Sequence, residues 1–214
     1  ATVSGGGEVR TNNDTAYDTT LVYPGVLIAP TNLVANAVSA SQVSVMWDAV
    51  STNKYQVFRS SNNGPYVLVG TPTASSFTDT GLTPNTTYLY QVKAVSDPNN
   101  VGPPSNIDLA TTTIFLDDPI VAGSTLIRAI HLLQLRTAVN AVRAAAGMSN
   151  ATFTNTIAPG VIISAIDVTE LRSNLDAARS IIGVPALQYT DPTLTAGSTL
   201  VKAVHVQKLR SGVK

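Results

Sequence analysis

Hydrophobic residues fall on every second position along much of the first half of the chain. Val43, Val45 and Trp47 follow this spacing. So do Tyr55, Val57 and Arg59, and then Tyr88, Tyr90, Val92 and Ala94. Successive side chains of a β-strand point to opposite faces, so this spacing predicts half-buried strands. Turn-forming residues separate them at 62–65, 83–85 and 97–100. Short strands at such intervals predict a β-sandwich over residues 28–113.

The hydrophobic period changes from two to about 3.6 after a short linker at residues 110–113. One face of a predicted helix at 132–146 carries Leu132, Leu135, Val139 and Val142. A second predicted helix at 168–182 has the same pattern, and a third is expected to begin near Val206. Gly147 and Gly183 follow the first two segments, as is typical of glycines that end helices.

One sequence pattern occurs three times in this helical half. The copies are FLDDPIVAGSTLIRAIHLLQLR (115–136), FTNTIAPGVIISAIDVTELR (153–172) and YTDPTLTAGSTLVKAVHVQKLR (189–210). Each begins with an aromatic residue and ends in Leu-Arg. Such self-similarity predicts a stack of helical repeat units at 115–147, 153–183 and 189–214, each too small to bury its own apolar face. Stacked units usually provide binding or assembly surfaces.

An N-terminal arm, residues 1–27, precedes the sandwich and begins with a run of glycines. A weak alternation then places Tyr17, Thr19, Leu21 and Tyr23 on one side of an extended segment. We expect Tyr17, Leu21 and Tyr23 to act in assembly, by adding a strand to an exposed sheet edge of a neighbouring subunit. The arm could also dock on its own domain, or be a leader without fixed structure.

Residues 28–113 resemble a fibronectin type III domain. The segment SVMWDAV (44–50) is similar to the family's second strand, KYQVFRSS (54–61) to its third, and GLTPNTTYLYQVKAV (81–95) to its tyrosine-corner signature. The resemblance implies that Trp47, Leu82 and Tyr88 are core residues, with the Tyr88 hydroxyl bonded to the backbone of the turn. It also implies a binding or spacer module without catalytic activity. The helical block resembles repeats at the C-termini of secreted bacterial multidomain proteins.

Composition excludes several classes of partner. Charged residues make up 12% of the 214 residues and the net charge is zero, so the chain has no basic field for nucleic acid or anionic lipid. No apolar run reaches the ~18 residues of a membrane span. The chain contains no cysteine and begins with Ala1, which is expected of a processed or trimmed product. We expect an extracellular or cell-surface location.

Two recurring polar positions are candidate functional residues. His131, Asp167 and His205 share one repeat position and could ligate a metal, but a closed ring of units would be needed to bring them together. We favour a role at the start of each helix, with Asp167 and Glu170 forming a capping box. Arg136, Arg172 and Arg210 could form a ligand-binding ladder. We favour a repeated structural contact, to Asp117, Asp191 or a neighbouring helix's last carbonyls.

The chain lacks the signatures of common catalytic sites. It has no cysteine nucleophile, no Gly-x-Ser-x-Gly turn and no phosphate-binding loop. Spacing alone leaves paired carboxylates for glycoside chemistry open. We therefore expect a protein that is not an enzyme and uses no cofactor or metal.

Two functions follow from these patterns. The first is a structural subunit that assembles with copies of itself into a bacterial surface filament or sheath. The neutral surface offers little repulsion against such assembly. The alternative is an adhesion module, or a module that binds carbohydrate or cell wall, within a larger secreted protein.

Overall fold

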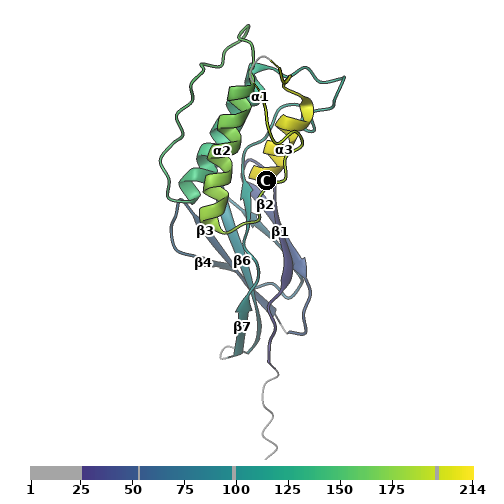
Figure 1. Cartoon of the computed structure of the whole chain (residues 1–214). Helices are drawn as coiled ribbons and strands as arrows, with labels where there is room; N and C mark the ends of the chain where they lie inside the picture. Colours follow the sequence, from purple (N-terminus) through teal and green to yellow (C-terminus); the bar gives the residue numbers. More distant parts are fainter. Residues whose placement is uncertain (1–25, 53, 98–99, 196–197) are drawn as a thin grey trace, which may run out of the picture.

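The protein has a β-sandwich at one end and a group of helices at the other. The computed structural model describes residues 26–52, 54–97, 100–195 and 198–214, and Figure 1 shows the two parts arranged along one long axis. The predicted fold class, a β-sandwich followed by a helical region, is confirmed. The assembly residues Tyr17, Leu21 and Tyr23 lie outside the described residues.

The sandwich consists of two antiparallel sheets. Within the described residues, one sheet has the strand order β1-β2-β5, formed by Thr31–Ser39, Gln42–Asp48 and Ser76–Thr80. The other has the order β4-β3-β6-β7, formed by Val67–Gly70, Lys54–Ser61, Thr87–Asp97 and Asn100–Pro104. Strand β8, Asp108–Thr111, pairs with the first part of β6, and β7 pairs with its last part.

The alternating hydrophobic positions face the space between the sheets. Trp47 packs edge-on against Tyr55, with ring centroids 5.1 Å apart. Leu82 and Tyr88 are also buried, and the Tyr88 hydroxyl accepts a hydrogen bond from the Thr83 backbone N–H at 2.9 Å. This bond ties the turn before β6 to the strand itself. The sandwich core therefore lies where the period of two in the sequence places it.

The helical region contains α1 (Ala129–Ala145), α2 (Ala165–Ile182) and α3 (Ala203–Val213). They run in the same direction, with their N-terminal ends pointing away from the sandwich (Figure 1). Each helix packs against the other two. The three helices therefore form a closed group, in which the third helix also contacts the first.

Each helix also begins about one turn earlier than the sequence analysis predicted. The first helical turn already includes His131, Asp167 and His205, which occupy the N3 position. Asp167 accepts from the Ser164 backbone N–H at 2.8 Å, so Ser164 is the N-cap residue. The predicted box of Asp167 with Glu170 was wrong, since Glu170 instead accepts from the Thr154 N–H.

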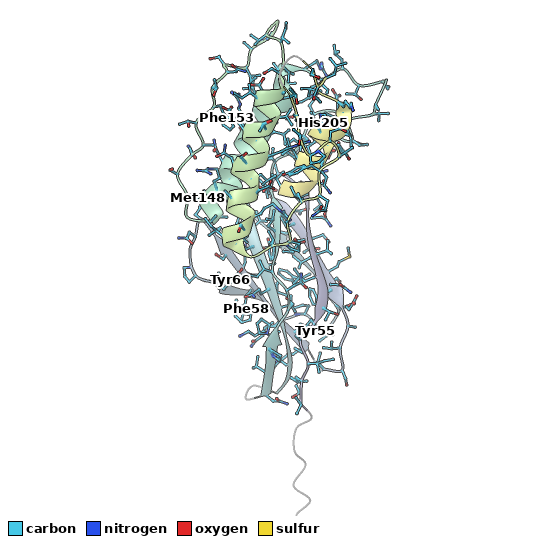
Figure 2. All side chains as sticks on the ribbon, viewed as in Figure 1. Tyr55, Phe58, Tyr66, Met148, Phe153 and His205 are labelled. Atoms are coloured by element: carbon cyan, nitrogen blue, oxygen red, sulfur yellow. The ribbon has the colours of Figure 1, made fainter. Side chains whose placement is uncertain are left out.

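The sandwich and the helices share one hydrophobic core. Leu89 of β6 and Leu109 of β8 are paired across their strands and both pack with the helices. Tyr66 and Met148 pack against the same core and lie at the junction in Figure 2. Gly147 sits at positive φ, and a Cβ there would lie 2.6 Å from the Asn63 amide nitrogen. The two parts are thus held in close contact.

Candidate functional site

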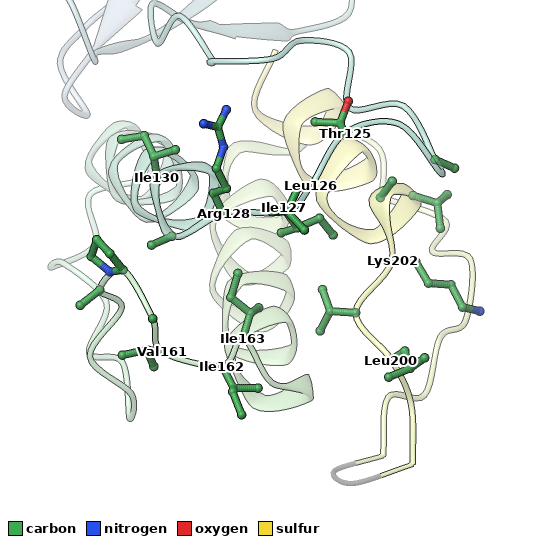
Figure 3. A pocket seen from close by; sticks show the side chains of 18 of the residues that line it. Thr125, Leu126, Ile127, Arg128, Ile130, Val161, Ile162, Ile163, Leu200 and Lys202 are labelled. Atoms are coloured by element: carbon green, nitrogen blue, oxygen red, sulfur yellow. The ribbon is translucent and has the colours of Figure 1, made fainter.

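An open apolar pocket, here called the cup, lies at the N-terminal ends of the helices. Its walls come from the segments that precede the helices, within residues 122–130, 158–163 and 200–204, and its volume is about 1060 Å³. Figure 3 shows aliphatic side chains from all three segments around one space, while Arg128 and Lys202 point away from its centre. None of the described lining residues is aromatic. The cup is thus an aliphatic surface at the tip of the molecule.

The most exposed aliphatic residues of the described chain include Leu126, Ile162 and Leu200, which are 78%, 86% and 81% exposed. Each lies two positions before an N-cap residue. The next residues along the chain, Ile127, Ile163 and Val201, pack against the helical core. Fully burying a Leu or Ile side chain contributes about 1.5–3 kcal/mol. Large aliphatic side chains gathered in one exposed patch therefore indicate a contact surface.

Stacked arginine and aromatic side chains hold the segments that form the cup. Each helix carries an arginine that lies over the aromatic ring at the start of another segment. The pairs are Arg136 over Phe153 at 4.2 Å, Arg172 over Tyr189 at 4.4 Å and Arg210 over Phe115 at 4.8 Å. The last pair joins the third helix to the first segment. The contacts therefore form a closed ring, which fixes the frame of the cup.

Two of these arginines also donate hydrogen bonds to backbone carbonyls. Arg210 is fully buried and donates to the oxygens of Leu116 at 2.7 Å and Asp117 at 2.8 Å. Arg172 donates to the equivalent oxygens of Thr190 at 3.2 Å and Asp191 at 2.9 Å. These carbonyls begin the segments and do not lie at helix C-termini. The arginines face the protein interior, where they act as structural contacts.

The histidines at the N3 positions are held by local partners. The His131 Nδ1 accepts from the Arg128 backbone N–H at 3.2 Å, so neutral His131 carries its proton on Nε2, 3.2 Å from an Asp117 carboxylate oxygen. His205 has the same arrangement with Lys202 and Asp191. Among the described residues, no group of three or more His, Asp or Glu side chains could hold a metal ion.

The pKa of His131 lies below its ordinary value of 6.5. Desolvation is the main cause, since it disfavours the imidazolium. The hydrogen bond to Asp117 raises the pKa, and the charges of Arg210 and Arg128 lower it. Folded His131 is therefore neutral at a pH at which the unfolded chain already binds a proton.

The free energy of unfolding is expected to decrease as pH falls below the ordinary histidine pKa of about 6.5, because the unfolded chain then binds a proton that folded His131 does not yet bind. The contribution of His131 to stability is fully present above the pKa of about 6.5 that it has in the unfolded chain. This contribution is lost as pH falls through the lower pKa of His131 in the folded protein. His131→Gln should flatten this slope. Urea unfolding of both proteins at several pH values measures it, and equal slopes would contradict the assignment.

The edges of the sandwich offer little room for an added strand. On β1, the N–H of Leu33 donates to the Asn106 side chain at 3.0 Å, and the N–H of Ala35 donates to the Asp108 side chain at 2.9 Å. Strands β4 and β5 are 4 and 5 residues long, and β7 ends in two prolines. Short, proline-containing or covered edges resist strand addition. We expected the arm to bind at such an edge, and the short and covered strands disfavour this.

The cup was missed in the sequence analysis, although its signal is visible there. Leu126, Ile162 and Leu200 are large apolar residues in segments outside the periodic helix pattern. No local pattern in the sequence indicates that these three segments converge. Among the described residues, none of the helices combines the length and hydropathy that a membrane crossing requires.

The sandwich defines a small all-β module, and comparison with known proteins identifies it. Residues 28–107 match the fibronectin type III domain family. This part of the chain is a fibronectin type III domain, as its resemblance predicted, and it is followed by the three-helix region.

Curated relatives match a segment about as long as this domain. Exoglucanase B of Cellulomonas fimi is 38% identical over 87 residues, which cover 39% of this chain and 8% of that protein. Poly(3-hydroxybutyrate) depolymerase of Ralstonia pickettii is 39% identical over 85 residues, 39% of this chain and 16% of that protein. Chitinase C of Streptomyces lividans is 34% identical over 89 residues, which cover 40% of this chain and 14% of that protein. The chain therefore spans less than a fifth of each relative's length.

Proposed function

We propose that this chain is a non-catalytic interaction module of an extracellular bacterial protein, with the cup as its contact surface. The observation that carries the proposal is the exposure of Leu126, Ile162 and Leu200 on a frame locked by buried arginines. A rigid frame loses little conformational entropy on binding, so most of the burial energy is available for affinity.

The comparisons support the extracellular and bacterial parts of this proposal. The relatives carry a similar domain within enzymes whose names refer to chitin, glucan or polyester. Intact chitin and long glucan chains do not cross a bacterial membrane, which favours an extracellular location for the enzymes that degrade them. A fibronectin type III domain in such a protein serves as a spacer or accessory module, and we propose the same role here.

The chemistry of the cup supports a non-catalytic role. Its polar side chains within the described residues are those of Thr125, Arg128 and Lys202. Arg128 pairs with Asp117 and Lys202 pairs with Asp191. The lining thus provides no nucleophile next to a base, which acyl or glycosyl transfer would require.

We also propose that the three helical segments are copies of one repeat unit, as in the C-terminal blocks of secreted bacterial multidomain proteins. Support comes from contacts that recur at equivalent sequence positions. Each arginine stacks on an aromatic ring, and Leu126, Ile162 and Leu200 have the same exposed environment. Repeats reuse one contact between units, and here the last contact closes the ring.

The partner of the cup is expected to be apolar. A glycan presents many hydroxyl groups, and burying them without replacement hydrogen bonds is unfavourable. The aliphatic lining therefore favours a protein segment or an apolar polymer over a carbohydrate or cell-wall glycan. Assembly with copies of the same chain into a filament or sheath stays a prediction at this point.

A triple variant, Leu126→Ser, Ile162→Ser and Leu200→Ser, tests the proposal. Wild-type and variant proteins are incubated with cellulose, chitin, cell-wall sacculi and poly(3-hydroxybutyrate) particles, and self-association is followed by sedimentation velocity. We expect wild-type protein to bind at least one partner, and the cup variant to lose at least ten-fold in affinity (about 1.4 kcal/mol).

A matched control replaces exposed apolar residues of the sandwich, in the double variant Val38→Ser and Met46→Ser. It should bind like the wild type. If wild-type protein binds none of these partners and stays monomeric, or if the cup variant binds equally well, the cup is not the contact surface.

A further inference from the structure

We infer that the cup binds residues 17–23 of a second copy of this chain, so that molecules associate head to tail. The inference rests on the proposed function of the cup as a contact surface and names its partner. The segment reads YDTTLVY. Its alternation brings Tyr17, Leu21 and Tyr23 to one side of an extended chain, which is the kind of apolar edge that an aliphatic cup can cover.

The volume of the cup is large enough to hold the side chains of a peptide segment. Its volume of about 1060 Å³ is at the upper limit of the roughly 300–1,000 Å³ found for small-molecule sites. Its lining contains few groups that could orient a polar ligand, and aliphatic side chains project from all three of its walls. A strand with several bulky side chains on one side would contact more than one wall at once.

The positions of the cup and of the first described residues determine which copy supplies the segment. The first described residue, Val26, is 95% exposed, and the described part of the chain begins at the end of the sandwich farthest from the helices (Figure 1). Leu27 lies next to Gly102 of β7, at that same end. The first described residues and the cup are thus at opposite ends of the molecule.

The reach of the chain excludes docking of this segment in the cup of its own molecule. Tyr17 precedes Val26 by nine positions, which span at most about 32 Å when fully extended. Strand β6 has 11 residues and is about 36 Å long, and the 18 residues of α2 add about 27 Å of helix towards the cup. The same segment lies beside the cup of another molecule when the sandwich end of one copy meets the helical end of the next.

This geometry gives an open assembly, because each copy donates its segment 17–23 from one end and binds the segment of another copy in the cup at the other end. Such head-to-tail contacts do not close into a dimer and continue as long as subunits are supplied. The acceptor is the helical tip, not a sheet edge, which agrees with the short and covered edges of the sandwich.

Two full-length variants test the inference in combination. The arm variant carries Tyr17→Ser, Leu21→Ser and Tyr23→Ser, and the cup variant carries Leu126→Ser, Ile162→Ser and Leu200→Ser. Sedimentation velocity over a range of concentrations, with negative-stain electron microscopy, reports their assembly. We expect wild-type protein to form chains of many subunits, and each variant alone to associate at least 30-fold more weakly.

The mixture is the decisive sample. The cup variant has an intact arm and the arm variant has an intact cup, so an equimolar mixture should form one-to-one dimers and nothing larger. Chains formed by the arm variant alone, or a mixture that stays monomeric, would overturn the inference. A wild-type protein that binds a polymer through the cup but remains monomeric would also overturn it, while leaving the proposed function intact.

Discussion

Arg210→Ala is expected to lower the free energy of unfolding by about 3–5 kcal/mol. Arg210 is fully buried, stacks on Phe115 and donates to two backbone carbonyls. Removing it leaves these carbonyls without donors and opens a cavity between α3 and the first segment. It also breaks the contact that closes the ring. Urea unfolding followed by circular dichroism measures the change.

Two further variants show whether the loss comes from this arrangement. Arg210→Lys keeps the charge but cannot reproduce the two-pronged guanidinium contact, so its stability should be intermediate. Arg128→Ala removes an arginine whose side chain is half exposed and paired at the surface, and it should have little effect. If Arg210→Ala were as stable as Arg128→Ala, the ring contact would not stabilise the fold.

The fibronectin type III domain could be predicted in detail from the sequence. Its strands are half-buried, so the period of two identifies the inward positions directly, and Trp47 and Tyr88 add signals that few other folds share. The length of the strands and the turn residues then limit the arrangement of the sheets. Local pattern and tertiary structure agree in this half of the chain.

The closed ring of helices could not be predicted in the same way. Arg210 and Leu116 are 94 positions apart, and no local pattern links them. Repeated units predict a stack as readily as a ring, and the choice depends on whether the last unit reaches the first. The helix starts were missed because His131 and His205 act at N3, where Glu or Gln is the expected residue.

The cup also exists only because the three helices close into a ring. Leu126, Ile162 and Leu200 are single apolar residues in separate segments, and exposed residues of this kind are common on protein surfaces. They form a surface only because parallel helices bring their preceding segments to one end. The candidate site is therefore a consequence of tertiary structure, although each of its residues is visible in the sequence.

Leu109→Ala is expected to lower stability by about 2–5 kcal/mol and to uncouple the two parts of the molecule. Leu109 belongs to β8 but is fully buried in the core that contains the helices, opposite Leu89. The chain has a single tryptophan, Trp47 in the sandwich core, so its fluorescence reports sandwich unfolding, and the far-ultraviolet circular dichroism reports the helices. In the wild type, the two signals should change together.

In the Leu109→Ala variant, we expect the helical signal to be lost at lower urea concentration than the Trp47 fluorescence. The cavity lies at the junction, and the helices depend on the shared core more than the sandwich does, since the sandwich has a second core of its own. Leu33→Ala makes the same change in that second core, and should lower stability without separating the signals. Coincident transitions in Leu109→Ala would show that the junction depends on other contacts, such as the one between Gly147 and Asn63.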